Sequence, residues 1–210
     1  YSDANEYLLN MSKEILPAVK KTPCIAGIGV HNPVIDMEEF LDKIIEMGFS
    51  GVNNEPFCGL YGEYFAKQME KAGIGFSREV ELIRLARQKN IFTIAWAMSP
   101  QESRRMAEAG ADVIGAMIGV TTGGLSGASE TTPLEQATKD IQAMVASAKS
   151  VNPDVLVLTH GGPLNDVQSA QYSIANSGAV GYASGSSGER IPTEQAVIEI
   201  TKQYKSMKLN

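Results

Sequence analysis

The sequence predicts an α/β fold in which six parallel strands, each followed by a helix, form most of a (β/α)8 barrel. Short apolar, β-branched runs alternate along the chain with longer segments whose apolar residues recur at helical spacing. Three strands are introduced in the same way, by a helix end, a glycine and a new apolar run, at Gly48, Gly110 and Gly178. Such alternation is typical of parallel sheets with right-handed crossovers.

The first half of the chain begins with a predicted helix over residues 2–20. The helix is predicted from apolar residues that fall on one stripe: Tyr7, Leu8, Met11, Ile15 and Val19. The elements that follow are, in order, a strand over 24–30, a helix over 36–47, a strand over 51–55, helices over 63–72 and 78–90, and a strand over 91–98.

The second half contains two capping boxes that predict where helices begin. They read Ser99-Pro100-Gln101-Glu102 and Thr132-Pro133-Leu134-Glu135. The first helix is expected to end at residue 108 and the second at about residue 150. The other elements are a strand over 112–119, a polar, glycine-rich loop over 121–131, a strand over 155–159, a helix over 166–176, a strand over 179–183 and a helix over 192–207.

This order of elements fits either an open doubly wound sheet or a (β/α)8 barrel. A barrel needs eight strands and typically about 250 residues, whereas this chain has 210 residues and opens on a helix. We favour a single incomplete barrel domain over residues 1–210, with six of the eight units. The first two units would be either removed sequence or replaced by a partner.

Composition narrows the class of ligand. A net charge of −6 and a pI near 5.0 disfavour nucleic acid and anionic membranes, whose phosphates need clustered Lys and Arg. No apolar run approaches the roughly 20 residues that span a bilayer. Cys24 and Cys58 make neither a disulfide framework nor a metal motif, and no signal peptide is evident. We expect a cytoplasmic protein that binds a small anionic metabolite.

Polar side chains gather directly after the predicted strands. Both histidines of the chain lie there, His31 after the first strand and His160 after the fifth. Ligands of such folds are held at the carboxyl ends of the strands. The other residues predicted to bind substrate at this edge are Asn53, Asn54, Thr121, Thr122, Gly123, Gly161, Gly162, Ser186, Ser187, Glu189 and Arg190. The alternative is that the two histidines are unrelated surface or capping residues.

The loops after the last two strands predict an anion site. In complete barrels, phosphate commonly binds between the loops after the seventh and eighth strands, and these loops take those places if two units are missing. Glycine lets the backbone approach an anion, although short connections also need glycine. Arg190 can grip a carboxylate or phosphate; alternatively it pairs with Glu189 or Glu194. Schiff-base aldolase chemistry is not expected, because no lysine follows a predicted strand.

Two residues are candidates for acid–base chemistry. His160 lies beside the predicted anion site, and histidine suits proton transfer near neutral pH. Glu55 ends the second strand and can activate water, unless it is a hydrogen-bonded core carboxylate. Glu55 and Glu189 offer oxygen ligands that suit Mg²⁺, but their spacing matches no metal motif, so the sequence leaves the cofactor open.

Five segments together resemble a known family: AGIGVHNP, MGFSGVNNEPFCGL, AEAGADVIGAMIGVTTGG, VNPDVLVLTHGGP and SGSSGERIPTE. They are similar to motifs of the phosphoenolpyruvate hydrolase-like TIM-barrel family, whose members are also called TIM-barrel signal transduction proteins and whose barrel forms the C-terminal part of a plant tomato mosaic virus resistance protein. Family members begin with two further strand–helix units. At Glu55 the chain departs from the family pattern, in which an apolar residue follows the Asn.

The resemblance implies a barrel related in fold to phosphoenolpyruvate mutase-like lyases and hydrolases. We therefore expect a hydrolase or lyase that acts on a small 2-oxo or enol-phosphate acid such as phosphoenolpyruvate or phosphonopyruvate. The alternative is a metabolite-binding or signal-transduction barrel that breaks no bond. In either case we expect a homo-oligomer.

Overall fold

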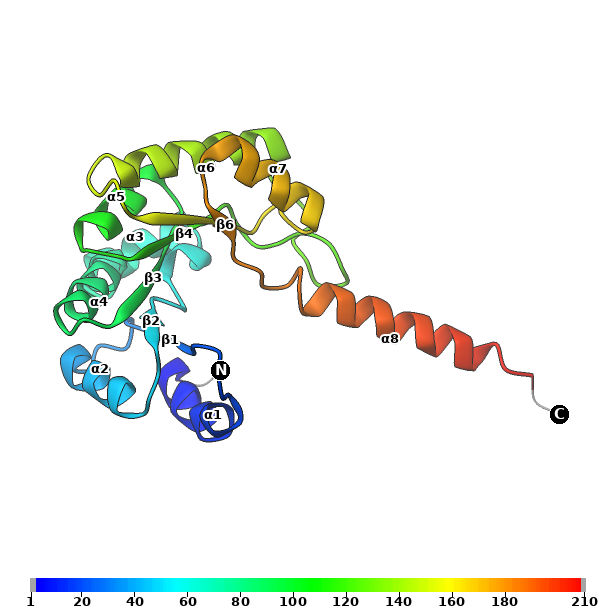
Figure 1. Cartoon of the computed structure of the whole chain (residues 1–210), viewed down its shortest axis with the longest axis horizontal. Helices are drawn as coiled ribbons and strands as arrows, with labels where there is room; N and C mark the ends of the chain where they lie inside the picture. Colours follow the sequence, from blue (N-terminus) through cyan, green and yellow to red (C-terminus); the bar gives the residue numbers. More distant parts are fainter. Residues whose placement is uncertain (1–2, 209–210) are drawn as a thin grey trace.

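The computed structural model describes residues 3–208 and contains one parallel sheet of six strands in the order β1-β2-β3-β4-β5-β6 (Figure 1). The strands are β1 (Ile25–Gly27), β2 (Gly51–Asn53), β3 (Phe92–Ala97), β4 (Val113–Met117), β5 (Leu156–His160) and β6 (Gly181–Tyr182). Each strand pairs with the next one along the chain. The predicted α/β fold with six parallel strands is confirmed, and the sheet forms a partial barrel.

Helices occupy the connections and cover one face of the sheet (Figure 1). They are α1 (Ala4–Ala18), α2 (Met37–Glu46), α3 (Glu63–Lys71), α4 (Phe76–Gln88), α5 (Pro100–Glu108), α6 (Leu134–Lys149), α7 (Val167–Ser177) and α8 (Arg190–Lys205), with a short 3-10 helix, η1 (Cys58–Tyr61). Helix α8 extends away from the sheet, and none of its residues is buried. Within residues 3–208, no helix combines the length and apolarity that crossing a membrane would require.

The two faces of the curved sheet differ in burial. On the helix-covered face, Ala95, Ile114 and Val157 are fully buried. On the opposite, concave face, Phe92 of β3 is 42% exposed and Leu156 of β5 is 49% exposed. Eight strands close a barrel around its interior side chains, so a sheet of six leaves part of that interior open.

Most predicted helix ends are confirmed by their backbone geometry. Gly48, Gly110 and Gly178 have φ values of 93°, 92° and 82°, the left-handed conformation that glycine adopts freely after a helix. Ser99 accepts a hydrogen bond from the Glu102 amide and caps α5 as predicted. The Thr132 capping box is wrong, because α6 begins at Leu134 and places Pro133, which makes no side-chain cap, at the N-cap position.

The predicted first helix is confirmed as α1, but most of its predicted apolar stripe does not face the core. Leu8 packs against the core, whereas Tyr7, Met11 and Ile15 are exposed. Asn5 and Ser12 are buried in their place. The reason is a pair of hydrogen bonds, since the Asn5 amide donates to the Gly29 carbonyl and its oxygen accepts from the Gly29 amide, both at 2.8 Å. The predicted start at residue 2 lies outside the described residues.

Several predicted strands are too long, and the first is the clearest case. The ladder of β1 ends near Gly27, although an apolar run continues to residue 30. The backbone amide and carbonyl of Gly29 both form hydrogen bonds with the Asn5 side chain instead of with a neighbouring strand. At the other end of the chain, α8 begins at Arg190, two residues before the predicted start.

Gly115 on β4 allows the side chain of its neighbour to lie across the sheet. Gly115 is paired with Trp96 of β3. A Cβ atom at position 115 would lie only 2.3 Å from Trp96 Cε3, well inside van der Waals contact. The indole ring therefore occupies the place where a β4 side chain would stand.

Substituting Gly115→Ala is expected to displace Trp96 and destabilise the protein by about 1–3 kcal/mol, the usual cost of overpacking. Trp96 is the single tryptophan of the chain, so intrinsic fluorescence reports its environment directly. Gly29→Ala is the control, because its Cβ would make only ordinary contacts, the shortest 3.4 Å. Unchanged fluorescence and stability in Gly115→Ala would contradict this packing.

Candidate functional site

Aromatic rings line the carboxyl ends of the strands. The Trp96 ring centroid lies 5.0 Å from that of His160 and 6.2 Å from that of Phe57, and His160 lies 6.4 Å from Tyr182. Trp96 spans the interval between β3 and β5 because Gly115 lies between them. The rings thus connect the loop after β2 with the ends of β5 and β6.

His160, the last residue of β5, is held through one ring nitrogen. Its Nδ1 lies 2.6 Å from the Ala183 carbonyl oxygen. A carbonyl only accepts hydrogen bonds, so Nδ1 carries the proton in the neutral ring and Nε2 keeps a free lone pair. Nε2 has no hydrogen-bond partner among residues 3–208, and the side chain is half-buried. This geometry leaves Nε2 able to accept a proton from a ligand.

Three consecutive backbone amides in the turn beside His160 are unpaired in the described chain. The backbone N–H groups of Gly185, Ser186 and Ser187 donate to no other group in the described chain. A Cβ atom on Gly185 would lie 3.3 Å from Cε1 of His160, which shows how closely this turn approaches the ring. The Ser187 hydroxyl contacts the Tyr182 hydroxyl at 2.6 Å. Successive unpaired amides make an anion-binding concavity in many proteins.

The loop after β4 and the loop after β5 are both rich in glycine and are hydrogen-bonded to each other. The Gly162 amide donates to the Gly119 carbonyl at 2.9 Å, and the Thr122 amide donates to the Gly162 carbonyl at 3.0 Å. Gly161 has a φ of 80°, and its missing Cβ would lie 2.1 Å from the Gly119 oxygen. The structure therefore brings Thr122, Gly161 and Gly162 together, but the Gly162 amide already donates to the Gly119 carbonyl. Thr121 is buried at the base of the same loop.

Arg190 is engaged by the protein itself. One guanidinium nitrogen donates to Glu194 Oε1 at 3.0 Å, and the other donates to the Gly123 carbonyl at 3.0 Å. Glu194 also accepts a hydrogen bond from the Leu125 amide at 2.7 Å, and these donors hold the pKa of its carboxyl below the ordinary value. Of the two hypotheses for Arg190, the structure shows the pair with Glu194. Ser186 is half-buried in the adjoining turn, and Glu189 is exposed.

The predicted site residues of the first half lie after β1 and β2, and most are already hydrogen-bonded. His31 places Nδ1 2.8 Å from the Ile74 oxygen and Nε2 3.0 Å from the Pro56 oxygen. Asn54 is fully buried, with its oxygen accepting from the Trp96 amide at 2.7 Å.

Asn53 and Glu55 lie at the same strand end. The Asn53 oxygen accepts from the Glu55 amide at 3.0 Å. The Glu55 side chain is exposed and makes no hydrogen bond or ion pair within residues 3–208, so it is not a core carboxylate.

A buried carboxylate that the sequence reasoning missed organises this region. Glu79 of α4 is 1% exposed, and it accepts hydrogen bonds from the Asn54 amide group at 2.5 Å and the Cys58 amide at 2.7 Å. His31 Nε2 lies 3.9 Å away. Burial raises the pKa of Glu79, against the opposing effect of its donors and His31. Burial and Glu79 also raise the pKa of the Cys58 thiol.

The sequence does carry a signal for Glu79. It stands in the apolar stripe of α4 beside Phe76, Leu82, Ile83 and Ala86, where a solvated glutamate is not expected. For metals, the described residues contain no group of three or more His, Cys, Asp and Glu side chains arranged to hold an ion.

Removing the buried carboxylate by Glu79→Ala is expected to destabilise the protein by about 2–4 kcal/mol, because the Asn54 and Cys58 donors lose their acceptor. Glu81→Ala on the same helix is the matched control, since it removes a surface pair with Arg84 worth less than about 1 kcal/mol. Urea denaturation measures both variants. Equal losses in the two would refute a special role for Glu79.

Comparisons with known proteins agree with this architecture. The chain is 39% identical over its full length to the ToMV susceptible protein tm-1(GCR26) and 38% identical to the ToMV resistance protein Tm-1(GCR237), both of Solanum lycopersicum. It spans 28% of the length of each. Among solved structures, a FabK mutant from Thermotoga maritima shares the fold with a TM-score of 0.51 and 19% identity, over 83% of this chain and 48% of that one.

A family model supplies the assignment that the motifs anticipated. The model described as phosphoenolpyruvate hydrolase-like matches residues 1–207, which is nearly the whole chain. The match covers every strand of the sheet and both glycine-rich loops. This chain belongs to the phosphoenolpyruvate hydrolase-like family.

Proposed function

We propose that this barrel binds a small anionic 2-oxo or enol-phosphate acid at the carboxyl edge of its sheet and acts on it as a hydrolase or lyase. The observation that carries the proposal is the closeness of the His160 ring to the turn whose Gly185, Ser186 and Ser187 amides are unpaired in the described chain. The turn supplies donors for a carboxylate or phosphate. Nε2 of His160 is the adjacent proton acceptor. Membership of the phosphoenolpyruvate hydrolase-like family supports the substrate class.

The proposal gives a part to the 185–187 turn, His160, Glu55 and Arg190 among the predicted residues, and to Trp96 in addition. The anionic group of the ligand binds the backbone amides of the 185–187 turn, because the Ser187 hydroxyl already donates to Tyr182, whose own proton goes to the Leu164 carbonyl. His160 moves the proton, and Trp96 forms the wall of the site beside it. Glu55 is the carboxylate proposed to activate water, directly or through Mg²⁺, because it is exposed at the end of β2. Arg190 acts on the site indirectly by holding the Gly123 carbonyl.

Ligand binding without turnover is the second candidate function, and two observations favour it. Arg190 is neutralised by Glu194 instead of facing a ligand. Glu55 makes no contact with His160 in the described chain, so the two acid–base groups are not assembled into a pair. A barrel that only binds a metabolite would need no more than the 185–187 turn and the Trp96 ring beside His160.

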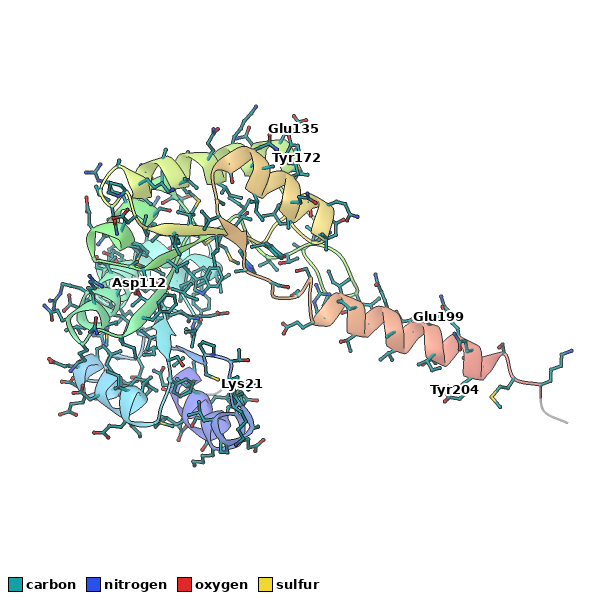
Figure 2. The ribbon with its side chains drawn as sticks, viewed as in Figure 1. Lys21, Asp112, Glu135, Tyr172, Glu199 and Tyr204 are labelled. Carbon is teal, nitrogen blue, oxygen red and sulfur yellow. The ribbon has the colours of Figure 1, made fainter. Side chains whose placement is uncertain are left out.

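Turnover is tested by incubating the protein with phosphoenolpyruvate, phosphonopyruvate and a set of 2-oxo acids, with and without Mg²⁺, and following phosphorus and proton NMR. Product is expected, and His160→Asn should slow its formation about 10²–10⁴-fold, because the Asn amide nitrogen can take the place of Nδ1 as the donor to Ala183 but the side chain cannot take up the proton. Glu135→Gln on the outer surface of α6 (Figure 2) is the control with unchanged rate. Line broadening of a ligand without product would favour the binding function.

Anion binding at the turn is tested separately with Gly185→Val. The Cβ of the added side chain would lie 3.3 Å from His160 Cε1, a tight contact that crowds the space between the turn and the ring, while the φ at this position places no strain on the substitution. We expect the dissociation constant of phosphoenolpyruvate to rise at least tenfold, about 1.4 kcal/mol. Thermal unfolding should stay close to that of the unmodified protein. An unchanged dissociation constant would place the anion elsewhere.

A further inference from the structure

A cavity lies among the helices beside the carboxyl end of β3, apart from the region of His160. It has a volume of about 600 Å³, within the range of small-molecule sites. Its walls come from η1, α3, the start of α4 and the start of α5, all of which belong to the helix-covered side of the sheet (Figure 1). Neither His160 nor any residue of the 185–187 turn lines it. The cavity is therefore separate from the proposed anion site.

The inner part of the lining is apolar. Cys58 and Phe76 are buried there, and Ala66 and Met98 are half-buried. The Met98 side chain can lie against η1 because position 59 is glycine, whose missing Cβ would be only 2.5 Å from the Met98 sulfur. An apolar, partly aromatic lining with a few polar groups at its edge is the usual composition of a site for a small molecule.

Most charged side chains at the mouth of the cavity already have partners within the protein. Glu63 pairs with Lys67 at 2.5 Å. Glu70 accepts hydrogen bonds from the Ser77 amide, at 2.9 Å, and from the Ser77 hydroxyl. Arg105 donates to the same hydroxyl at 3.0 Å. These groups therefore need no ligand to satisfy their charges.

Glu102 is the charged residue of the lining that lacks a cation. It is half-buried, and its Oε2 accepts a hydrogen bond from the Met98 amide at 2.7 Å. Its Oε1 has no hydrogen-bond or ion-pair partner within residues 3–208, and it is not one of the fully buried atoms. Burial raises the pKa of Glu102, as does Glu79 nearby, against the opposing effect of the Met98 amide and Arg105. An ammonium group at Oε1 would supply the missing positive charge.

We propose that this cavity binds a small molecule that carries one primary ammonium group on an apolar body. The ammonium donates to Glu102 Oε1, and the body lies against Phe76 and Met98. A hydrogen bond between two charged groups is about twice as strong as one between neutral groups. An anionic ligand would instead meet the carboxylates of Glu63, Glu70 and Glu102. Amine binding here is independent of the chemistry at His160.

Binding is tested by titrating the protein, labelled with carbon-13 at its methionine methyl groups, with 2-phenylethylamine and recording NMR spectra. The Met98 signal, assigned by its loss in Met98→Leu, should shift with a dissociation constant of about 1 mM or lower. Phenylacetate and 2-phenylethanol keep the aromatic body but replace the ammonium with a carboxylate or a hydroxyl. Both should bind at least about tenfold more weakly than the amine.

Glu102→Gln should raise the dissociation constant of the amine at least about tenfold, because the amide oxygen still accepts from the Met98 amide but carries no charge. Glu63→Gln is the matched control on the same lining, and it should change the constant less than about twofold, since Lys67 already neutralises Glu63. Thermal unfolding should show that both variants keep the fold. A Met98 signal indifferent to the amine, equal affinity for the three compounds, or equal losses in the two variants would overturn the assignment.

Discussion

The absence of a side chain at Gly115 is the constraint on which the candidate site depends. A Cβ there would lie 2.3 Å from Trp96, so only glycine lets the indole cross β4 and reach His160 at 5.0 Å. The ring also stacks on Phe57, which fixes the loop after β2. The absence of a side chain at Gly115 thus lets Trp96 connect the loop after β2 with the end of β5. Packing of this kind transmits a change at one strand to its neighbours because protein interiors contain few voids.

Hydrogen bonds to the buried side chain of Glu79 also support this edge of the sheet. Glu79 gathers the Asn54 and Cys58 donors around a buried carboxylate, and Asn54 in turn bonds the Trp96 backbone. An unpaired buried charge is costly, whereas one with several donors fixes the groups around it. The loop that carries Glu55 is therefore held by side chains from α4 and β3. This arrangement gives an exposed carboxylate a rigid support, which a catalytic or binding group requires.

Much of the fold follows from local signals in the sequence, and the exceptions have definite causes. Glycines at 48, 110 and 178 fix helix ends because their backbone conformations are local properties. The length of β1 was not predictable, since it is set by Asn5, which lies 24 residues before Gly29. The burial of Asn5 on α1 likewise accompanies the exposure of Tyr7, Met11 and Ile15. The order of strand and loop places His160, Gly161 and Gly162 at the carboxyl edge of the sheet. The role of buried Glu79 and the pairing of Arg190 with Glu194 depend instead on tertiary contacts.

The most direct test of the site is the protonation pattern of the His160 ring, read from long-range proton–nitrogen NMR spectra. The chain has two histidines, so a His31→Gln variant assigns the signals. Because Nδ1 faces the Ala183 carbonyl, the neutral ring should carry its proton on Nδ1, and the Nε2 resonance should shift when phosphoenolpyruvate is added. A ring protonated on Nε2, or an Nε2 signal indifferent to every anionic ligand, would contradict the assignment of His160 to the ligand site.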